Sequence, residues 1–509
     1  MLAKINSFGL TGLQGFPVTV EVDIHYGIKT YCTVGLPDTA NKESEQRVRA
    51  AVKNSGFNFP ADNITVNLAP ADQKKEGPLY DLPIALAILT ASGQLPRVDP
   101  GFVILGEIAL DGALRPVNGV LPLLISAMEK GFTRFILPKG NCREASFLKG
   151  AEVYAPDSLR QTALFLSGEL PLSPVPASDF EAYRDSRRAE VDFADIKGQA
   201  AAKRAMEAAV SGGHNVLMIG PPGAGKTMLA KAMVGIMPDL SYEEAMEITK
   251  IHSVSGMLNP DEGVIAMRPF RSPHHSATLP ALVGGGVHAL PGEVSLAHGG
   301  ALFLDEMPEY ARRTLEALRQ PLEDGKITVS RAAVKAEYPA DFMLIASMNP
   351  CPCGNYGSKT QVCRCSQAEI KKYMARLSGP MLDRIDLHIE VDSVRFEDMR
   401  SEAEEEPTSA VKARVEACRA VQRERLAPYG LRTNAQMTAP LIRKFCALDA
   451  ESEQMLGKAF ERLNLTARAY SRILKVARTL ADMEGAENLA PRHLKEAIFY
   501  RSLDRKYWQ

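Results

Sequence analysis

The feature that most constrains the fold of this chain is the stretch 220–227, which has the sequence GPPGAGKT. It follows the apolar run Val216–Ile219 and precedes the helix-forming run 228–233, MLAKAM. A strand, a glycine-rich turn and a helix in this order are typical of a phosphate-binding loop, because glycines let backbone N–H groups surround phosphate oxygens at a helix N-terminus. The sequence therefore predicts a nucleoside triphosphate site at Gly220, Pro221, Pro222, Gly223, Ala224, Gly225, Lys226 and Thr227.

Two side chains of this loop have separate expected roles. Lys226 would reach the β- and γ-phosphates of ATP, and the hydroxyl of Thr227 would bind Mg²⁺. The alternative is a glycine-rich turn that carries a lysine by chance. Two apolar strands farther along the chain favour the phosphate-binding interpretation.

The first of these strands, Ala301–Leu304, is a continuous apolar run that ends at Asp305 and Glu306. Buried parallel strands have this composition, and their carboxyl ends present ligands. We expect Asp305 to hold Mg²⁺ through water and Glu306 to polarise the attacking water. A strand that merely ends in two acids is the alternative. The second strand, 342–347, is followed by Asn349, whose amide would orient that water or sense the γ-phosphate.

The three strands in this order resemble those of an AAA+ ATPase, where they carry the Walker A, Walker B and sensor 1 motifs. A further match lies at 379–386, GPMLDRID, where the magnesium-chelatase and MCM branch has its arginine finger. The resemblance implies that Arg384 enters the nucleotide site of a neighbouring subunit and stabilises charge on the γ-phosphoryl group. The local alternative is an ion pair of Arg384 with Asp383 or Asp386.

A helical lid is expected from the helical periodicity that begins at Ala410. Arg468, Arg472 and Lys475 recur at the spacing of one helix face. The resemblance implies a sensor 2 arginine at Arg468, with Arg472 as the second choice. A solvated helix face is the alternative for Arg472 and Lys475.

The N-terminal third alternates strand-like and helix-like segments, as a mixed α+β domain does; a strand at 18–24 has a candidate hairpin partner at 29–34. Residues 106–112, GEIALDG, and the segment 118–139 resemble the proteolytic domain of Lon proteases. The catalytic dyad of that domain does not match, since Leu79 follows Gly-Pro where the serine belongs and Leu121 occupies the place of the lysine. Covalent proteolysis needs an activated hydroxyl beside a base, so we expect a scaffold or binding module.

One family matches essentially the whole chain. The match rests on 270–275 (FRSPHH), 284–286 (GGG), 291–298 (PGEVSLAH) and 349–354 (NPCPCG). The chain thus resembles the YifB/ComM family of magnesium-chelatase-like AAA+ proteins, which carry an inactive Lon-like domain in front. The resemblance implies a ring hexamer, and the best-known member is a DNA helicase for branch migration in natural transformation.

The expected fold class is α/β, in three domains. An α+β Lon-protease-like domain, of the ribosomal protein S5 domain 2-like type, would cover 1–168, followed by a linker at 169–190. A central AAA+ P-loop α/β domain would cover 191–395, and a C-terminal helical lid 396–509. About three domains also suit a chain of 509 residues, since one domain usually takes ~100–200.

The formal net charge of −1 provides no general basic field, so DNA binding would need local cations. Residues 325–338 alternate like a β-hairpin, and related AAA+ rings aim such hairpins into the central pore. Lys326, Arg331 and Lys335 are therefore candidate phosphate contacts, with a solvated hairpin face as the alternative. The long insertion 249–296, rich in Gly, Pro and His, is a second candidate for DNA contact.

Four of the eight cysteines crowd together, at Cys351, Cys353, Cys363 and Cys365. The chain has neither an unbroken apolar run of ~18 residues nor a secretory leader, so we expect a cytoplasmic protein without a membrane partner. In a reducing cytosol crowded thiols indicate a metal before disulfides, and four thiolates can surround a tetrahedral Zn²⁺. Four unligated thiols in a loop are the alternative. Beside Asn349, such a site would stiffen the sensor region.

These expectations describe an ATP-driven hexameric DNA helicase that promotes branch migration. Its cofactors would be ATP, Mg²⁺ and a structural Zn²⁺; its partners would be branched or single-stranded DNA, with recombination proteins as further candidates. One alternative is the motor subunit of a metal chelatase that acts on a porphyrin, which the Lon-like domain and the cysteine cluster fit poorly. Another is a protein-remodelling ATPase whose front domain recruits clients. DNA-stimulated ATP turnover separates the first interpretation from both.

Overall fold

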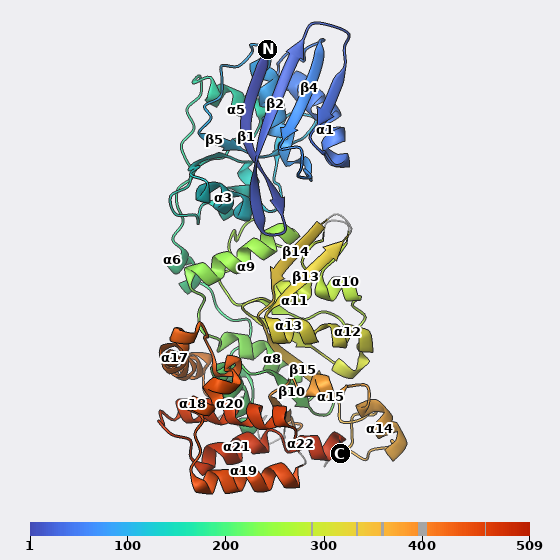
Figure 1. Cartoon of the computed structure of the whole chain (residues 1–509), viewed down its shortest axis with the longest axis vertical. Coiled ribbons are helices and arrows are strands. Elements are labelled where there is room, and N and C mark those ends of the chain that lie inside the picture. Colours follow the sequence, from blue (N-terminus) through green and yellow to red (C-terminus); the bar gives the residue numbers. More distant parts are fainter. Residues whose placement is uncertain (287–288, 332–333, 358–360, 395–404, 464, 509) are drawn as a thin grey trace.

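The computed structural model describes residues 1–286, 289–331, 334–357, 361–394, 405–463 and 465–508. The molecule is elongated, with a sheet of N-terminal strands at one end, a parallel sheet in the middle and a group of C-terminal helices at the other end (Figure 1). The two termini lie near opposite ends of the long axis (Figure 1).

The N-terminal sheet has seven strands in the order β3-β4-β2-β1-β5-β8-β9. Its strands are β1 (Leu2–Thr11), β2 (Gln14–His25), β3 (Tyr31–Val34), β4 (Asn63–Ala69), β5 (Phe102–Ile104), β8 (Arg134–Ile136) and β9 (Glu152–Tyr154). A separate ribbon pairs β6 (Glu107–Ile108) with β7 (Leu114–Arg115), and the helices are α1 (Thr39–Asn54), α2 (Asp81–Ala91), α3 (Val120–Glu129), α4 (Cys142–Ala145) and α5 (Leu159–Leu166). The expected hairpin of 18–24 with 29–34 is wrong, because β3 pairs in parallel with β4 while β2 lies between β1 and β4.

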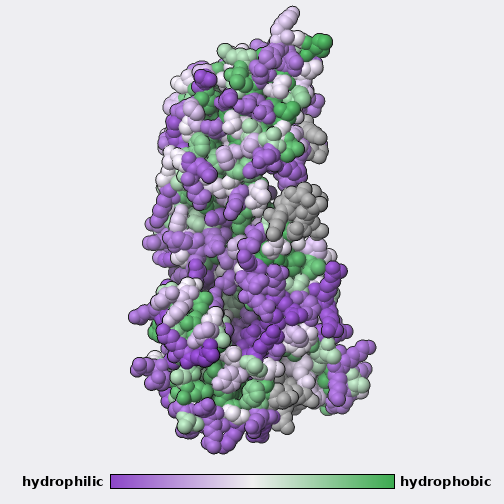
Figure 2. Space-filling model, in the orientation of Figure 1, coloured by the Kyte–Doolittle hydropathy of each residue, from purple (hydrophilic) through white to green (hydrophobic). Residues whose placement is uncertain are grey.

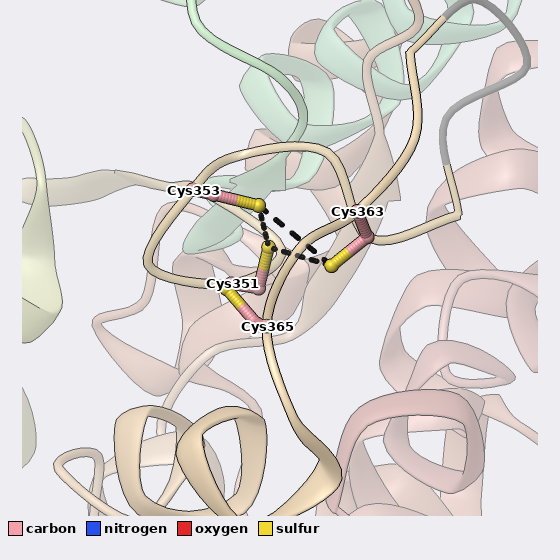
Figure 3. Close-up of side chains that lie close together, drawn as sticks. All are labelled: Cys351, Cys353, Cys363 and Cys365. Carbon is pink, nitrogen blue, oxygen red and sulfur yellow. Dashed lines mark hydrogen bonds between the residues drawn. The ribbon is translucent and has the colours of Figure 1, made fainter.

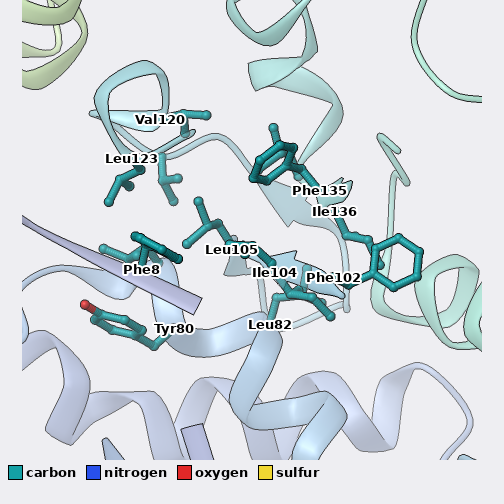
Figure 4. Packing of buried hydrophobic residues seen from close by; sticks show 14 of the residues in the cluster. Phe8, Tyr80, Leu82, Phe102, Ile104, Leu105, Val120, Leu123, Phe135 and Ile136 are labelled. Atoms are coloured by element: carbon teal, nitrogen blue, oxygen red, sulfur yellow. The ribbon is translucent and has the colours of Figure 1, made fainter. Parts of the chain in front are cut away.

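Large apolar side chains from the strands and from α2 and α3 fill the core behind this sheet. Figure 4 shows how Phe8, Leu82, Ile104 and Leu123 meet there. Leu79 is 8% exposed and Leu121 0%. The two positions that would carry a Lon-type dyad are thus part of the hydrophobic core.

The middle of the molecule is a five-stranded sheet of order β11-β12-β15-β10-β16, in which all adjacent pairs are parallel. Its strands are β10 (Val216–Ile219), β11 (Phe270–Arg271), β12 (Ala301–Leu304), β15 (Met343–Met348) and β16 (Leu387–Glu390). Around it lie α7 (Ala200–Gly212), α8 (Lys226–Gly235), α9 (Tyr242–Ser255), α10 (Leu279–Val283), α11 (Glu293–Leu296), α12 (Arg312–Ala317), α13 (Arg319–Asp324), α14 (Gln367–Met374) and α15 (Gly379–Leu382). A hairpin of β13 (Lys326–Arg331) and β14 (Val334–Pro339) projects towards the N-terminal end (Figure 1).

The C-terminal part is helical, as expected of a lid. Its helices are α17 (Thr408–Leu426), α18 (Ala439–Phe445), α19 (Ala450–Arg462), α20 (Ala467–Met483), α21 (Pro491–Phe499) and α22 (Leu503–Trp508). α17 and α20 pack against α7, and their apolar residues belong to one core with β10 and α8. The mixed α/β class expected from the sequence is confirmed.

A shared core joins the N-terminal part to the middle of the molecule. Ala245, Met246 and Ile248 of α9 belong to the same hydrophobic cluster as the N-terminal sheet. Ser253 of α9 donates a hydrogen bond to the carboxylate of Glu144 at 2.9 Å, and burial raises the pKa of Glu144. α9, which follows the glycine-rich loop in sequence, is therefore built into the front of the molecule, and the expected linker 169–190 includes the short helix α6 (Phe180–Asp185).

The surface is largely polar. The face in Figure 2 is mainly hydrophilic, with hydrophobic residues in small groups. Every helix in the described ranges is too short or too polar to cross a lipid bilayer.

Candidate nucleotide-binding site

The glycine-rich loop connects β10 to α8 at the carboxyl edge of the parallel sheet. Gly223 and Gly225 have φ angles of 75° and 85°, in the left-handed region that glycine adopts without strain. Gly220 is needed for a different reason, since a Cβ there would lie 2.2 Å from the carbonyl oxygen of Val391. α8 begins at Lys226, so its unpaired N–H groups and positive dipole end face the loop.

Lys226 lies across the loop. Its Nζ donates to the carbonyl oxygen of Gly220 at 2.7 Å and to Oδ1 of Asn349 at 3.2 Å. Burial lowers the pKa of Lys226, and the two acids at the end of β12 oppose that shift. The structure thus brings together two predicted site residues that are 123 positions apart.

Thr227 and Asp305 also lie side by side. The Thr227 hydroxyl donates to Oδ2 of Asp305 at 3.3 Å. Hydroxyl and carboxylate oxygens are ligands of the kind that Mg²⁺ accepts, so the pair fits the predicted magnesium site. Ser347 at the end of β15 is buried, and its hydroxyl donates to the other oxygen of Asp305. Sequence reasoning missed Ser347, although a polar residue two positions before Asn349 in an apolar strand was a usable signal.

Glu306 has a backbone conformation that is unusual for its residue type. Its φ of 49° lies in the left-handed region, at a cost of about 1–3 kcal/mol. Its N–H donates to Oδ1 of Asp305 at 3.1 Å and to the Ser347 hydroxyl at 3.3 Å. The two consecutive acids therefore differ in their surroundings, because the carboxylate of Asp305 is hydrogen-bonded while Glu306 is exposed.

Arg384, the predicted arginine finger, follows α15 and is 4% exposed. Its guanidinium donates to the carboxylate of Glu323 on α13 and to the carbonyl oxygen of Pro380 at 2.6 Å. The ion-pair partner is thus Glu323, rather than the adjacent Asp383 or Asp386 considered from the sequence. The guanidinium is thus buried beneath the exposed side chain of Glu323.

The two candidates for sensor 2 have different environments. Arg472 forms an ion pair with Asp386, which also accepts from His214 at 3.1 Å. Burial acts to raise the pKa of Asp386, but the contacts with Arg472 and His214 hold this pKa below its ordinary value. Arg472 therefore fastens the lid to the core, whereas the Arg468 side chain is 61% exposed and lies 4.0 Å from Asp383.

The candidate DNA-contacting residues are on the hairpin of β13 and β14. Lys326 is opposite Pro339 at its base, and its Nζ forms an ion pair with Glu337 at 3.1 Å. Arg331 is the last residue of β13, and Lys335 is the second residue of β14. The side chains of Arg331 and Lys335 lie outside the described part of the structure.

The four clustered cysteines converge in the loop between β15 and α14 (Figure 3). The Sγ of Cys351 lies 3.4 Å from that of Cys353 and 3.7 Å from that of Cys363, and all four sulfurs lie within 4.8 Å of one another. A tetrahedral Zn²⁺ with bonds of about 2.3 Å needs sulfurs about 3.8 Å apart, so the donor set fits zinc.

Comparisons with known proteins agree with this arrangement. Three family models match: "Magnesium chelatase, subunit ChlI" at residues 192–399, "Subunit ChlI of Mg-chelatase" at 20–141, and the ChlI C-terminal model at 405–501. YifB of Escherichia coli is 43% identical over 507 residues, which cover 99% of this chain and 98% of that protein. Competence protein ComM of Haemophilus influenzae is 43% identical over 509 residues, with the same coverage. The chain belongs to the YifB/ComM family.

A YifB/ComM protein therefore carries the AAA+ fold of magnesium chelatase in its middle part, and this fold is that of an ATPase. The front part has a second resemblance: a Lon protease of Methanosarcina barkeri is 33% identical over 98 residues, 19% of this chain and 12% of that protein. Both relations agree with the fold class expected from the sequence.

Proposed function

We propose that this YifB/ComM protein is an ATP-driven hexameric DNA motor that promotes branch migration in homologous recombination, as in natural transformation. One observation carries the proposal: Lys226, Asp305 and Asn349 converge at one edge of a parallel sheet, in a chain 43% identical to a competence protein over its whole length. We also propose the domain limits 1–168, 191–395 and 396–509, and a cytoplasmic location.

The chemical roles follow from the positions of the side chains. The loop N–H groups and Lys226 bind the phosphates, and Thr227 and Asp305 hold Mg²⁺. Glu306 is exposed beside them and polarises the attacking water, while Asn349, hydrogen-bonded to Lys226, senses the γ-phosphate.

Arg384 acts on the nucleotide of the next subunit, and Arg468 is the sensor 2 arginine. The two guanidinium groups are close enough for Arg468 to contribute to the lowered pKa of Arg384, which burial mainly causes. When subunits meet, Arg384 exchanges the exposed carboxylate of Glu323 for the γ-phosphoryl oxygens. Lys326, Arg331 and Lys335 then grip DNA phosphates from the hairpin.

The four cysteines bind a structural zinc ion, and this part of the proposal has its own test. Protein purified without chelator should contain about one zinc per chain by elemental analysis, because four thiolates complete the coordination of one ion. Metal-free protein of full stability would contradict the zinc assignment and leave the motor assignment intact.

ATP turnover measured with and without forked DNA tests the motor itself. The proposal expects forked DNA to stimulate turnover and ATP to drive displacement of the branch. Turnover that responds to unfolded protein but not to DNA would instead support a remodelling ATPase. A response to a porphyrin and Mg²⁺ would support a chelatase motor.

A further inference from the structure

The loop that carries the cysteines touches the phosphate-binding loop directly. Gly354 has a φ of 80°, and a Cβ built on it would lie 2.5 Å from Cδ of Pro222. Real Cβ atoms do not approach other atoms so closely, so only glycine fits between the two loops. Gly354 follows Cys353 and donates its N–H to the carbonyl oxygen of Cys351 at 2.9 Å.

The same short segment reaches the nucleotide site at a second point. Asn349, two residues before Cys351, accepts a hydrogen bond from Nζ of Lys226 at 3.2 Å. Residues 349–354 therefore contact the phosphate-binding loop at both ends, through Asn349 and through Gly354. Cys351 and Cys353 lie between these two contacts, and Cys351 is fully buried.

Regular secondary structure does not hold this segment in place. Between Met348 and Gln367 the described residues form turns, with neither helix nor strand. The thiols add interactions that fix its path: the four sulfurs converge (Figure 3), and the N–H of Tyr356 donates to Sγ of Cys351 at 3.3 Å. A metal ion that ties the four sulfurs together would define the shape of the segment.

We propose that the four-cysteine site is a metal-dependent brace for the phosphate-binding loop. With zinc bound, the segment 349–354 holds Pro222 and Lys226 in the geometry that nucleotide needs; without zinc, the segment relaxes and both contacts are lost. Zinc occupancy thereby controls ATP hydrolysis from outside the nucleotide site. The inference rests on the zinc and nucleotide sites proposed above.

The chain contains its own reporter for this loop. Trp508 is the only tryptophan. Its ring lies 5.9 Å from that of Tyr507, which lies 6.3 Å from the ring of Tyr356 in the cysteine loop. Cys353, Cys363 and Cys365 pack against the same hydrophobic cluster as Trp508. The fluorescence of Trp508 therefore follows the state of the loop independently of activity.

The first experiment removes zinc from the full-length protein with a chelator. Bound zinc, Trp508 emission, affinity for a fluorescent ATP analogue and ATP turnover are followed together. Because a misplacement of about 1 Å at a catalytic site can cost about a hundredfold, we expect turnover to fall ten- to a hundredfold as zinc leaves and emission shifts. Added Zn²⁺ should restore all four quantities.

The second experiment breaks the brace while keeping the metal. In Gly354→Ala the new methyl group displaces Pro222, so turnover should fall by a similar factor with zinc content unchanged. Gly485→Ala is the matched control, since Gly485 has a φ of 66° but open space around it. It carries the same backbone penalty and should turn over ATP like the parent.

The outcomes separate the proposals. Apoprotein that turns over ATP at the parental rate, or a Gly354→Ala variant equal to the Gly485→Ala control, would overturn the brace and leave both sites standing. Parent protein without zinc would overturn the metal site and the brace with it. Zinc-loaded parent protein that neither binds nor hydrolyses ATP would overturn the nucleotide site.

Discussion

At the scale of single residues, Glu306 is the most unusual feature of the candidate site. A glutamate in the left-handed region costs about 1–3 kcal/mol relative to a relaxed backbone. The neighbouring bonds compensate: the N–H of Glu306 is held by Asp305 and Ser347, and Asp305 is held in turn by Ser347. Backbone strain of this kind is characteristic of catalytic and ligand-binding sites.

Glu306→Gln should keep ATP binding and lose turnover. The amide has the same size but cannot polarise water, while Lys226 and the magnesium ligands are unchanged. We expect unchanged affinity for ATP and phosphate release reduced at least about a hundredfold. Glu309→Gln is the control, because Glu309 lies three residues away and pairs with Arg376 at 2.5 Å on the surface. Equal loss of binding and turnover in Glu306→Gln would contradict the catalytic role.

The sequence could predict the residues that follow a strand, but not their distant partners. Lys226, Asp305 and Asn349 could be placed together because the carboxyl ends of neighbouring parallel strands meet at one edge. Arg384 and Glu323 are 61 positions apart in the sequence, and their pairing depends on how α13 packs against the segment that follows α15. No local sequence pattern encodes that contact.

At the scale of elements, the hairpin of β13 and β14 makes contact with the front of the molecule. A Cβ built on Gly12, at the tip between β1 and β2, would lie 3.2 Å from Cβ of Ala336 in β14. The hairpin base is fixed by antiparallel pairing, with Lys326 opposite Pro339. Strand pairing therefore fixes the base of the hairpin, and Arg331 lies at the other end of β13.

Replacing Arg331 and Lys335 by alanine should separate DNA grip from ATP chemistry. Each lost phosphate contact makes the plot of log affinity against log salt concentration less steep by about 0.7–0.9. We therefore expect a flatter salt dependence of DNA binding and no strand displacement, with DNA-independent ATP turnover close to that of the parent. Forked DNA unwound at the parental rate would move the DNA grip to the insertion 249–296.

Elements with a strong local pattern were predictable. The alternating segment 325–338 forms the expected hairpin, and the helical periodicity that begins at Ala410 falls in α17. The pairing of β2 with β1 was not predictable from the sequence, because β1 carries polar and glycine residues that weaken its strand pattern, such as Asn6, Ser7 and Gly9. Pairing of β3 with β4 spans a helix and is decided by tertiary packing.

At the scale of the whole molecule, the proposed ring makes each ATP site depend on two chains. Arg384→Ala and Lys226→Ala subunits should each be inactive alone, because one lacks the finger and the other lacks the phosphate-binding lysine. In an equal mixture about a quarter of the interfaces combine an intact loop with an intact finger, so turnover should partly return. If no mixing ratio restores turnover, Arg384 serves only its own subunit through Glu323.

The junction between the front domain and α9 predicts a change in stability without a change in catalysis. Ser253→Ala removes one donor to the buried carboxylate of Glu144, which should lower the free energy of unfolding of this region by about 1–3 kcal/mol. Ser255→Ala is the control, because its hydroxyl bonds only locally, donating to the carbonyl oxygen of His252 at 2.9 Å and accepting from the N–H of Met257 at 3.3 Å. Thermal unfolding should show the loss for Ser253→Ala alone, while both variants hydrolyse ATP like the parent.

Because α9 and the N-terminal sheet share one core, the front domain is a lever arm attached to the ATPase part of the molecule. Ile248 of α9 packs against Gly299, just before β12, whereas β2 extends along the long axis to the far end of the molecule (Figure 1). A tilt of α9 during ATP turnover would therefore be magnified into a larger displacement at that end. A dye attached at the exposed position of Tyr26, just after β2, would report this displacement from the outer end of each subunit in the proposed ring.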